Sequence, residues 1–482
     1  MASGRTWLVD LIVVLVSGGL LFAGTGLHPV AVLTWLFPVP LLLVAPHRGW
    51  RRTGVLALVA GLLGTANLVH YGLATLSLPA PLVGVLVLAR ALLLLAYALT
   101  WRALVRSGRL VLAAVAAPAA WVVGEWLISR SPAVGDWLSL STTQAGSHRL
   151  LAVAAYAGSS GLSFLVVGVA AAACALALGV RRRTVVGPLV WLVLLVVVAP
   201  VSAWAVAQTP DGPAVRVAAV AVPQPYDPVD VDTAAGQRLV DRFVAEVDRL
   251  ASQGAEVVVL PEKSFASSGG SGWLAPLQAV ADQEGVVVVV GTMNRSGGTT
   301  ENLAIALRPR ARAVEYRKQH LVPSYESDFT PGTELAGFGS PAGRWGLAVC
   351  KDLDFPALTR AYARSGTGLL AVPAWDFDTD AWLHSRIAVV RGVETGTTVV
   401  RSARNGALTV SDPTGRVLVD HRTAPREVTS VLVTVAAGSH DTVYDRSGDW
   451  FVVLCGIVVG IGWLIGPLRR AAGRTSARGS AV

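Results

Sequence analysis

Residues 345–352 read WGLAVCKD. An apolar run ends there in Cys350 and two charged residues follow, as expected where a buried strand delivers one reactive side chain to the edge of a sheet. Two other apolar runs end in the same manner, one in Glu262 and one in Lys318. The sequence therefore predicts a carboxylate, an ammonium and a thiol at three strand ends.

The region around these three residues alternates between short, mostly Val-rich segments and helical patterns. Strands are predicted at 215–222, 256–260, 286–291, 302–307, 347–350, 369–372, 397–401, 407–411 and 428–435. Helices are predicted at 239–250, 273–283 and 380–394. Strands that alternate with helices indicate a layered α/β domain, and at about 240 residues this domain can bury a full core.

The chain as a whole is too apolar for a soluble protein, and its apolar residues are unevenly spread. Of 482 residues, 53% are hydrophobic and only 15% are charged, and the mean hydropathy is +0.56. A transmembrane helix needs about 20 mostly apolar residues. Eight segments are candidates: 6–26, 29–46, 53–76, 80–104, 109–129, 157–180, 184–208 and 449–468.

Basic residues set the expected orientation. The net charge is +9, but the arginines cluster in short loops at 48–52, 102–109 and 181–183 and after the last span, where the positive-inside rule places them. We therefore expect no nucleic-acid partner and a multi-pass protein with both termini in the cytoplasm.

Seven spans then place the soluble part outside the cytoplasm. The predicted division is a membrane domain with seven transmembrane helices at 1–208, an extracytoplasmic catalytic domain at 209–448, a C-terminal transmembrane helix at 449–468 and a basic cytoplasmic tail at 469–482. The loop at 130–156 is also expected outside, along the membrane surface. A transporter is disfavoured, because the spans contain few ionisable residues.

Glu262, Lys318 and Cys350 together favour nucleophilic catalysis. A cysteine becomes a good nucleophile when a base takes its proton, and Glu262 is the candidate base. Lys318 is the candidate for stabilising an anionic oxygen, with help from backbone N–H groups after Cys350. Singly, each has an ordinary structural interpretation: a buried free thiol, a helix-start carboxylate and a solvated ammonium. The joint pattern predicts acyl transfer through a thioester.

The flanking residues resemble a known family. The matching segments are Pro261-Glu262, 316–323 with Glu326 beyond it, Val349-Cys350, 401–406, 412–415 and 158–166. They are similar to the Glu–Lys–Cys motifs of the nitrilase (carbon–nitrogen hydrolase) superfamily, and within it to the membrane branch, the apolipoprotein N-acyltransferases. The resemblance covers nearly the whole chain. It implies a four-layer α-β-β-α sandwich beside a polytopic helical membrane domain.

The resemblance also implies roles and substrates. Glu262 would be the base, Lys318 the oxyanion stabiliser, Cys350 the nucleophile and Glu326 a supporting carboxylate. The acyl donor would be a membrane phospholipid, and the acceptor the N-terminal diacylglyceryl-cysteine of an apolipoprotein at the bacterial cell membrane. No metal-ligand cluster is apparent in the sequence, and this chemistry needs neither a metal nor a cofactor.

Two features depart from the family pattern or remain open. Lys351 and Asp352 follow the nucleophile where typical members have Tyr and Glu, and Lys351 is expected to pair with Asp352 or Glu326, to help hold the thiolate, or to add no new chemistry. Trp375, Phe377 and Trp382 are either a lid that keeps water from the thioester and contacts lipid, or ordinary core aromatics.

The same triad is compatible with other functions. A membrane-anchored amide hydrolase would use it on a small amide, and the departure at 351–352 leaves a catalytically inactive scaffold open. The number of spans favours a lipid substrate, because a soluble substrate gives an enzyme little reason to carry them.

Overall fold

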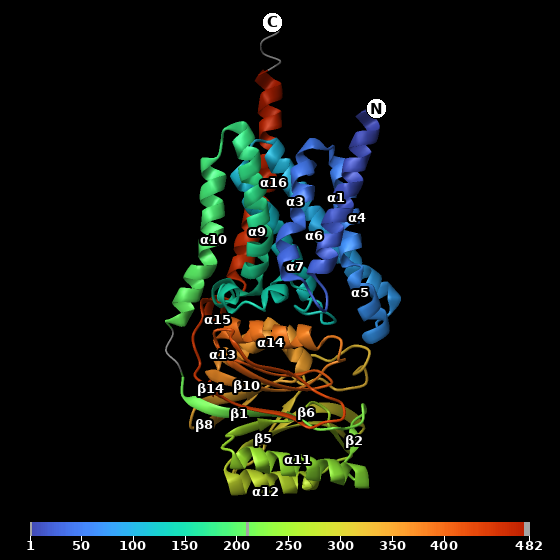
Figure 1. Cartoon of the computed structure of the whole chain (residues 1–482), viewed down its shortest axis with the longest axis vertical. Helices are drawn as coiled ribbons and strands as arrows, with labels where there is room; N and C mark the ends of the chain where they lie inside the picture. Colours follow the sequence, from blue (N-terminus) through green and yellow to red (C-terminus); the bar gives the residue numbers. More distant parts are fainter. Residues whose placement is uncertain (1, 209–211, 477–482) are drawn as a thin grey trace.

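A bundle of apolar helices and a layered α/β domain are stacked along the long axis of the molecule (Figure 1). The computed structural model describes residues 2–208 and 212–476, with side chains at 6–208 and 212–464. The start of α1 and the end of α16 (Trp450–Ser476) both lie at the end of the bundle farthest from the sheets.

Five helices within the described residues are long and apolar enough to cross a membrane. They are α1 (Ala2–Gly24), α6 (Ala80–Arg106), α7 (Leu110–Ser129), α9 (Ala154–Arg182) and α10 (Val186–Ala207). A sixth results if α4 (Trp50–Thr65) and the 67–75 segment, which meet at a bend of 42°, are counted as one span. That segment comprises α5 (Asn67–His70) and a π-helical turn at Tyr71–Thr75. All of these helices coincide with predicted spans.

The other two predicted spans are not among these helices, for two different reasons. The segment predicted at 29–46 is broken into α2 (Ala31–Leu36), α3 (Pro38–Val44) and a 3-10 turn at Ala45–His47, because Pro38 and Pro46 cannot donate backbone hydrogen bonds within a helix. The last apolar helix has described side chains only from Trp450 to Leu464. The predicted tail at 469–482 lies outside the residues with described side chains, and the count of eight spans stays a prediction.

The loop predicted along the membrane surface is buried in its central part, residues 134–145, and exposed or half-buried toward its start. Its 3-10 helix at Leu140–Gln144 is fully buried, and Trp137 retains 8% of its exposure. Two membrane-domain side chains hold it: Arg90 donates to the Leu138 carbonyl, and Glu125 accepts from the Leu140 N–H at 2.8 Å. The loop is therefore packed between the helix bundle and the α/β domain.

Two mixed sheets form the centre of the α/β domain. The first has the order β14-β1-β3-β5-β4-β2, and β6 and β7 extend it from β5. Its strands are β1 (Ala214–Ala221), β2 (Val229–Asp230), β3 (Val257–Val259), β4 (Phe265–Ser267), β5 (Val287–Ser296), β6 (Thr299–Leu307), β7 (Val314–Arg317) and β14 (Thr429–Ala436). The second is ordered β13-β12-β11-β10-β9-β8. It contains β8 (Ala336–Ser340), β9 (Gly343–Leu347), β10 (Thr367–Trp375), β11 (Thr398–Arg404), β12 (Ala407–Ser411) and β13 (Val417–Arg422).

The sheets pack face to face between two helical layers, which confirms the predicted four-layer α-β-β-α sandwich. Residues such as Val217, Val289, Leu347 and Val400 fill the space between the sheets. The helices α11 (Ala234–Ser252) and α12 (Ala275–Glu284) cover the outer face of the first sheet, far from the bundle (Figure 1). The second sheet is covered by α13 (Pro356–Arg364) and α14 (Ala381–Thr395), which face the bundle.

Each predicted strand and helix of the domain has a counterpart in the structure, with one correction at the nucleophile. The strand predicted at 347–350 ends at Leu347 as β9, and Cys350 begins a 3-10 turn at Cys350–Asp354. The Asp352 side chain accepts the Val349 N–H at 3.0 Å, so this N–H is not available to extend the ladder. The sequence did not predict β2, β4, β8, β13, α13 or α15 (Val443–Ser447).

Candidate active site

Glu262 lies three residues beyond β3, in a loop held between the two sheets. Its backbone N–H donates to the carbonyl of Ala374 on β10 at 3.2 Å. Gly291 on β5 approaches the Pro261 carbonyl so closely that a Cβ atom could not be placed there. The Glu262 side chain is consequently buried, at the carboxyl end of a parallel strand.

Glu262 belongs to a buried network of carboxylates and ammonium groups. The Lys318 Nζ, just after β7, lies 2.9 Å from Glu262 Oε1 and 2.9 Å from Glu326 Oε2. Asn302 on β6 donates through Nδ2 to Oε1 of both carboxylates at 2.6 Å. Among the described residues, each hydrogen bond to the Glu262 side chain falls on Oε1, which leaves Oε2 for a proton.

The charges in this network fix its protonation state. Burial alone would lower the pKa of Lys318, but Glu262 and Glu326 outweigh burial and hold that pKa well above its ordinary value. Burial would raise the pKa of Glu326, but Lys318 and Lys263 outweigh it and hold that pKa well below its ordinary value. Lys318 is therefore an ammonium and Glu326 a carboxylate throughout the neutral range.

Cys350 sits at a strained position next to this network. Its φ of +43° lies in the left-handed region, which is costly for a residue with a Cβ atom and is often found at functional sites. The residue as a whole is partly exposed, and its Sγ lies 3.5 Å from the Trp375 carbonyl. Burial and then the charge of Glu262 raise the thiol pKa well above its ordinary value, although Lys318 and Arg401 oppose them. A neutral thiol of this kind needs a base.

Asp352 fastens the lysine segment to the nucleophile turn. Its Oδ1 accepts the backbone N–H groups of Gln319 at 3.2 Å and His320 at 2.9 Å. Its Oδ2 accepts the Tyr316 hydroxyl at 2.8 Å as well as the Val349 N–H. Asp352 thus fixes the chain on both sides of Lys318 relative to Cys350.

Lys351 contacts the membrane domain rather than the carboxylates of the site. Its Nζ donates to the carbonyls of Pro132 at 3.2 Å and Ala133 at 3.3 Å, and lies 4.8 Å from the Phe355 ring. Among the described side chains it forms no ion pair with Asp352 or Glu326, so that one of the three alternatives is wrong, and the other two stay open. Asp352 is engaged by segment 316–320, and Glu326 is engaged by Lys318 and Lys263.

The three aromatic residues predicted as a lid lie in two places. The Trp375 ring is flanked by Lys263 Nζ at 4.7 Å and by the Arg404 guanidinium at 4.1 Å. Phe377 lies 4.8 Å from the Tyr325 ring, next to Glu326 in sequence. Trp382 packs instead against the cluster that joins the bundle to α14, with Tyr71 and Trp137 among its members. Their proposed role as a lid stays a prediction.

The sequence analysis missed three parts of the site. Asn302 carries no recognisable sequence signal. Arg401 on β11 forms a buried bidentate ion pair with Asp376, with one N–O distance of 2.9 Å, and only its place in a family-like segment pointed to it. Lys263 had a signal that was not used, namely the scarcity of lysine in the chain.

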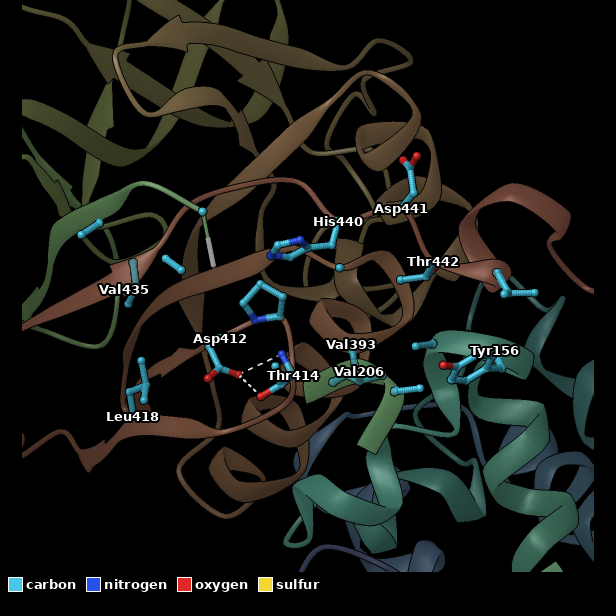
Figure 2. A pocket seen from close by; sticks show the side chains of 18 of the residues that line it. Tyr156, Val206, Val393, Asp412, Thr414, Leu418, Val435, His440, Asp441 and Thr442 are labelled. Atoms are coloured by element: carbon cyan, nitrogen blue, oxygen red, sulfur yellow. Dashed lines mark hydrogen bonds between the residues drawn. The ribbon is translucent and has the colours of Figure 1, made fainter. Parts of the chain in front are cut away.

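A separate cavity of about 430 Å³ opens where α9 and α10 meet the α/β domain (Figure 2). Its lining includes Tyr156, Val393, Asp412 and His440. The Asp412 carboxylate is turned into its own loop, where it accepts the backbone N–H and the hydroxyl of Thr414. None of the residues predicted for catalysis lines this cavity.

Comparison with known proteins finds two family models in one chain. Residues 216–438 match the carbon–nitrogen hydrolases, and residues 17–172 match the apolipoprotein N-acyltransferase N-terminal domain. An apolipoprotein N-acyltransferase of Geobacter metallireducens is 26% identical over 92% of this chain and 93% of that protein. The (R)-stereoselective amidase of a Pseudomonas species is 32% identical over 30% of this chain and 56% of that protein.

Solved structures similar to the α/β domain include the yeast protein Nit3, described as a member of branch 10 of the nitrilase superfamily (TM-score 0.40, 18% identity, 46% of this chain and 90% of that one). An amidase from Nesterenkonia sp. AN1 in complex with butyramide has a TM-score of 0.41 at 22% identity, over 51% of this chain and 98% of that one. A hydrolase model and an N-acyltransferase membrane model occur together along the chain, and a relative matches it over nearly its whole length. The chain therefore belongs to the apolipoprotein N-acyltransferase family, the membrane branch of the nitrilase superfamily.

Proposed function

We propose that this protein moves an acyl chain from a membrane phospholipid, through a thioester on Cys350, to the α-amino group of the N-terminal diacylglyceryl-cysteine of lipoproteins. Its family supports the reaction class. One structural observation carries the choice of a lipid substrate: the residue after the nucleophile, Lys351, donates to the Pro132 carbonyl of the membrane domain at 3.2 Å. The nucleophile turn thus contacts the loop at 130–156, which is packed against the helix bundle.

In the first half-reaction, Glu262 takes the Cys350 proton as the sulfur attacks the ester carbonyl of the phospholipid. The Lys318 ammonium and the backbone N–H groups after Cys350 stabilise the resulting oxyanion. The tetrahedral intermediate collapses to a thioester, and Glu262 returns the proton to the leaving lysophospholipid oxygen. The raised pKa of Cys350 supports this order, because a neutral thiol attacks only as its proton leaves.

In the second half-reaction, the α-amino group of the acceptor attacks the thioester. Glu262 accepts a proton from the attacking nitrogen, Lys318 again stabilises the oxyanion, and collapse forms the amide and releases Cys350, which regains its proton. The two steps share one site, so the kinetics are expected to be ping-pong. Lys318 keeps its proton throughout, which its contacts of 2.9 Å with two carboxylates support.

The family and the apolar helices make this a membrane protein. We infer further that the termini are cytoplasmic, that the α/β domain lies outside the cytoplasm, and that the chain divides into the domains predicted from its sequence. The distribution of arginine supports this orientation, since the loops at 48–52, 102–109 and 181–183 are basic.

Mass spectrometry of the membrane-purified protein tests the reaction. After incubation with phospholipid vesicles, the Cys350 peptide is expected to carry a fatty-acyl adduct that hydroxylamine removes and that Cys350→Ala lacks. A diacylglyceryl-cysteine peptide is then expected to discharge the adduct and gain the acyl chain. An adduct that water discharges as fast as the peptide does would favour a hydrolase. No adduct after prolonged incubation would contradict the proposal and leave a scaffold.

A further inference from the structure

Lysine is confined to the active site in this chain. The 40 basic residues comprise 37 arginines and three lysines, and the lysines are Lys263, Lys318 and Lys351. All three side chains are buried, and they lie beside the carboxylates or the nucleophile described above. A compact ammonium and a planar guanidinium are not interchangeable in a buried site. The composition therefore indicates that these three positions require an ammonium, and only Lys318 has a role in the proposed reaction.

Lys263 occupies a backbone position that does not suit it. It directly follows Glu262 and has a φ of +46°, in the left-handed region. Glycine adopts this conformation without strain, whereas a residue with a Cβ atom is strained there. Retention of a long side chain at such a position indicates that the side chain itself is needed.

The Lys263 ammonium is directed at Glu326. Its Nζ lies 2.8 Å from Glu326 Oε1, opposite the oxygen that Lys318 contacts. The rings of Trp375 and Phe329 lie 4.7 Å and 5.5 Å from the same nitrogen, which favours a cation there. The side chain is 7% exposed, so its charge is poorly screened by water.

The network is electrically balanced only when Lys263 is included. Glu262 and Glu326 share Asn302 Nδ2 and Lys318 Nζ, so the two carboxylates are close neighbours. Two carboxylates with one ammonium leave an excess negative charge, which favours protonation of one carboxylate. The second ammonium removes that excess.

We propose that Lys263 is a positioning residue: its ammonium holds Glu326 in place and balances its charge, so that Glu262 is ready to take the Cys350 proton. This rests on the proposed function only in assigning Glu262 as the base. The other charged groups near the network include Arg404, which acts on Glu262, the Arg401–Asp376 pair, which acts on Cys350, and Lys351, which acts on Lys318. They are unchanged in the variants below.

The test is the pH dependence of Cys350 acylation by p-nitrophenyl butyrate, followed by release of nitrophenol and by mass spectrometry in detergent. Lys263→Gly relieves the backbone while it removes the ammonium, and Lys263→Met keeps the chain length. For both variants, the midpoint of the acidic limb of the pH–rate profile is expected to shift to a pH about one unit higher. Acylation is then about tenfold slower below the midpoint, and the rates converge at higher pH.

The control is Arg249→Met, which removes a half-exposed cation on the far helical layer and is expected to leave the midpoint unchanged. A profile for Lys263→Gly that superimposes on that of the wild type, or that drops equally at each pH, would overturn the proposal. The small ester separates this result from the proposed function: acylation by p-nitrophenyl butyrate but not by phospholipid would contradict the lipid substrate and still test Lys263.

Discussion

Glu262 acts on Cys350 in two opposing ways. As a base it would promote attack by the sulfur, whereas as a nearby negative charge it raises the thiol pKa and disfavours the free thiolate. The two effects separate in reactions that differ in their need for a base. Acyl transfer requires proton transfer during attack, while alkylation by iodoacetamide consumes thiolate that is already present.

Glu262→Gln is therefore expected to change the two reactions in opposite directions. Acyl transfer should fall by roughly 10²- to 10⁴-fold, the usual contribution of a general base. Alkylation of Cys350 at mildly alkaline pH should become faster, because loss of the Glu262 charge lowers the thiol pKa, with about a tenfold gain in thiolate for each unit. Peptide-resolved mass spectrometry measures both reactions in one preparation.

Cys174 and Cys455, which are buried in the helix bundle, provide an internal reference for alkylation. If acyl transfer and alkylation both decreased, Glu262 would act through the structure of the site rather than as a base.

Among single residues, the sequence predicted the site residues that follow strands but missed those that contact them from other segments. Glu262, Lys318 and Cys350 were recognisable because each follows an apolar run and has family-like flanks. Lys263 looks like an ordinary solvated charge until the structure buries it against Glu326. The partners of Lys351 are two backbone carbonyls of a distant loop, which no side-chain pattern encodes.

Helix α14 connects the two parts of the molecule through a buried ion-pair cluster. Arg391 on this helix lies 2.6 Å from Asp136 in the buried loop and 2.7 Å from Glu394 one turn away. Glu394 in turn accepts the Ser159 N–H at 2.6 Å, just after the break that Gly158 makes near the start of α9. One arginine thus serves two carboxylates from different elements.

Arg391→Met is expected to destabilise the protein strongly. Removing one partner from a buried pair typically costs about 3–5 kcal/mol, because the remaining charge is left without compensation. The measurement is the thermal unfolding midpoint in detergent. Arg446→Met is the matched control, since its pair with Asp441 is 70% and 69% exposed and a surface pair contributes only about 0–1 kcal/mol.

The loss of stability in Arg391→Met is also expected to depend on pH. Burial raises the pKa of Glu394 from its ordinary value to about 7, even though Arg391 opposes the change. Between the ordinary value of 4.5 and about 7 the folded protein binds a proton that the unfolded chain releases, so stability falls as the pH rises through this range. Loss of Arg391 strengthens this effect, and the deficit should shrink at acid pH. A deficit equal to that of Arg446→Met would contradict the role of the cluster.

The main strands could be predicted because short Val-rich segments alternate with helical patterns. The long apolar helices could be predicted from the length of their apolar segments. The sequence analysis missed β2, with two residues, β4, with three, and the Gly-rich β8, which are too short or too irregular for a periodic signal. The second predicted span is broken for a different reason. Its composition is apolar enough, but its prolines divide it into short helices.

The whole molecule stacks one helical bundle on one sandwich, with both described ends of the chain at the far end of the bundle (Figure 1). The α9–α10 turn, with its three arginines, lies at that same end. This arrangement agrees with the proposed orientation, in which this end faces the cytoplasm.

Cysteine labelling tests the orientation. In a background with Cys174, Cys350 and Cys455 changed to Ala, Ser296→Cys in the β5–β6 turn is expected to react with a membrane-impermeant maleimide in intact cells. Thr184→Cys between α9 and α10 should react only after the membrane is opened. Both original residues are exposed, so accessibility within the fold does not limit either reaction. Labelling of Thr184→Cys in intact cells would contradict the orientation.

The docking of the two domains could not be predicted from the sequence. The contacts that hold them together join residues far apart in the chain, such as Arg391 with Asp136 and the Tyr71 hydroxyl with Asp380 at 2.6 Å. The sequence of either domain alone does not indicate that these side chains are partners. The same contacts bury the central part of the loop at 130–156. Because the sequence does not reveal these contacts, the loop was expected along the membrane surface.

The ion pairs of Lys318 and Lys263 have a consequence for an enzyme that delivers acyl chains to an amine. Its own amines are potential off-pathway acceptors, and those next to the thioester are the most exposed to self-acylation. An ammonium has no lone pair and cannot attack a carbonyl carbon. Because Glu262 and Glu326 hold the pKa of Lys318 well above its ordinary value, the site protects that side chain from the acyl chain that Cys350 carries, and the Lys263 ammonium lies against the same Glu326 carboxylate.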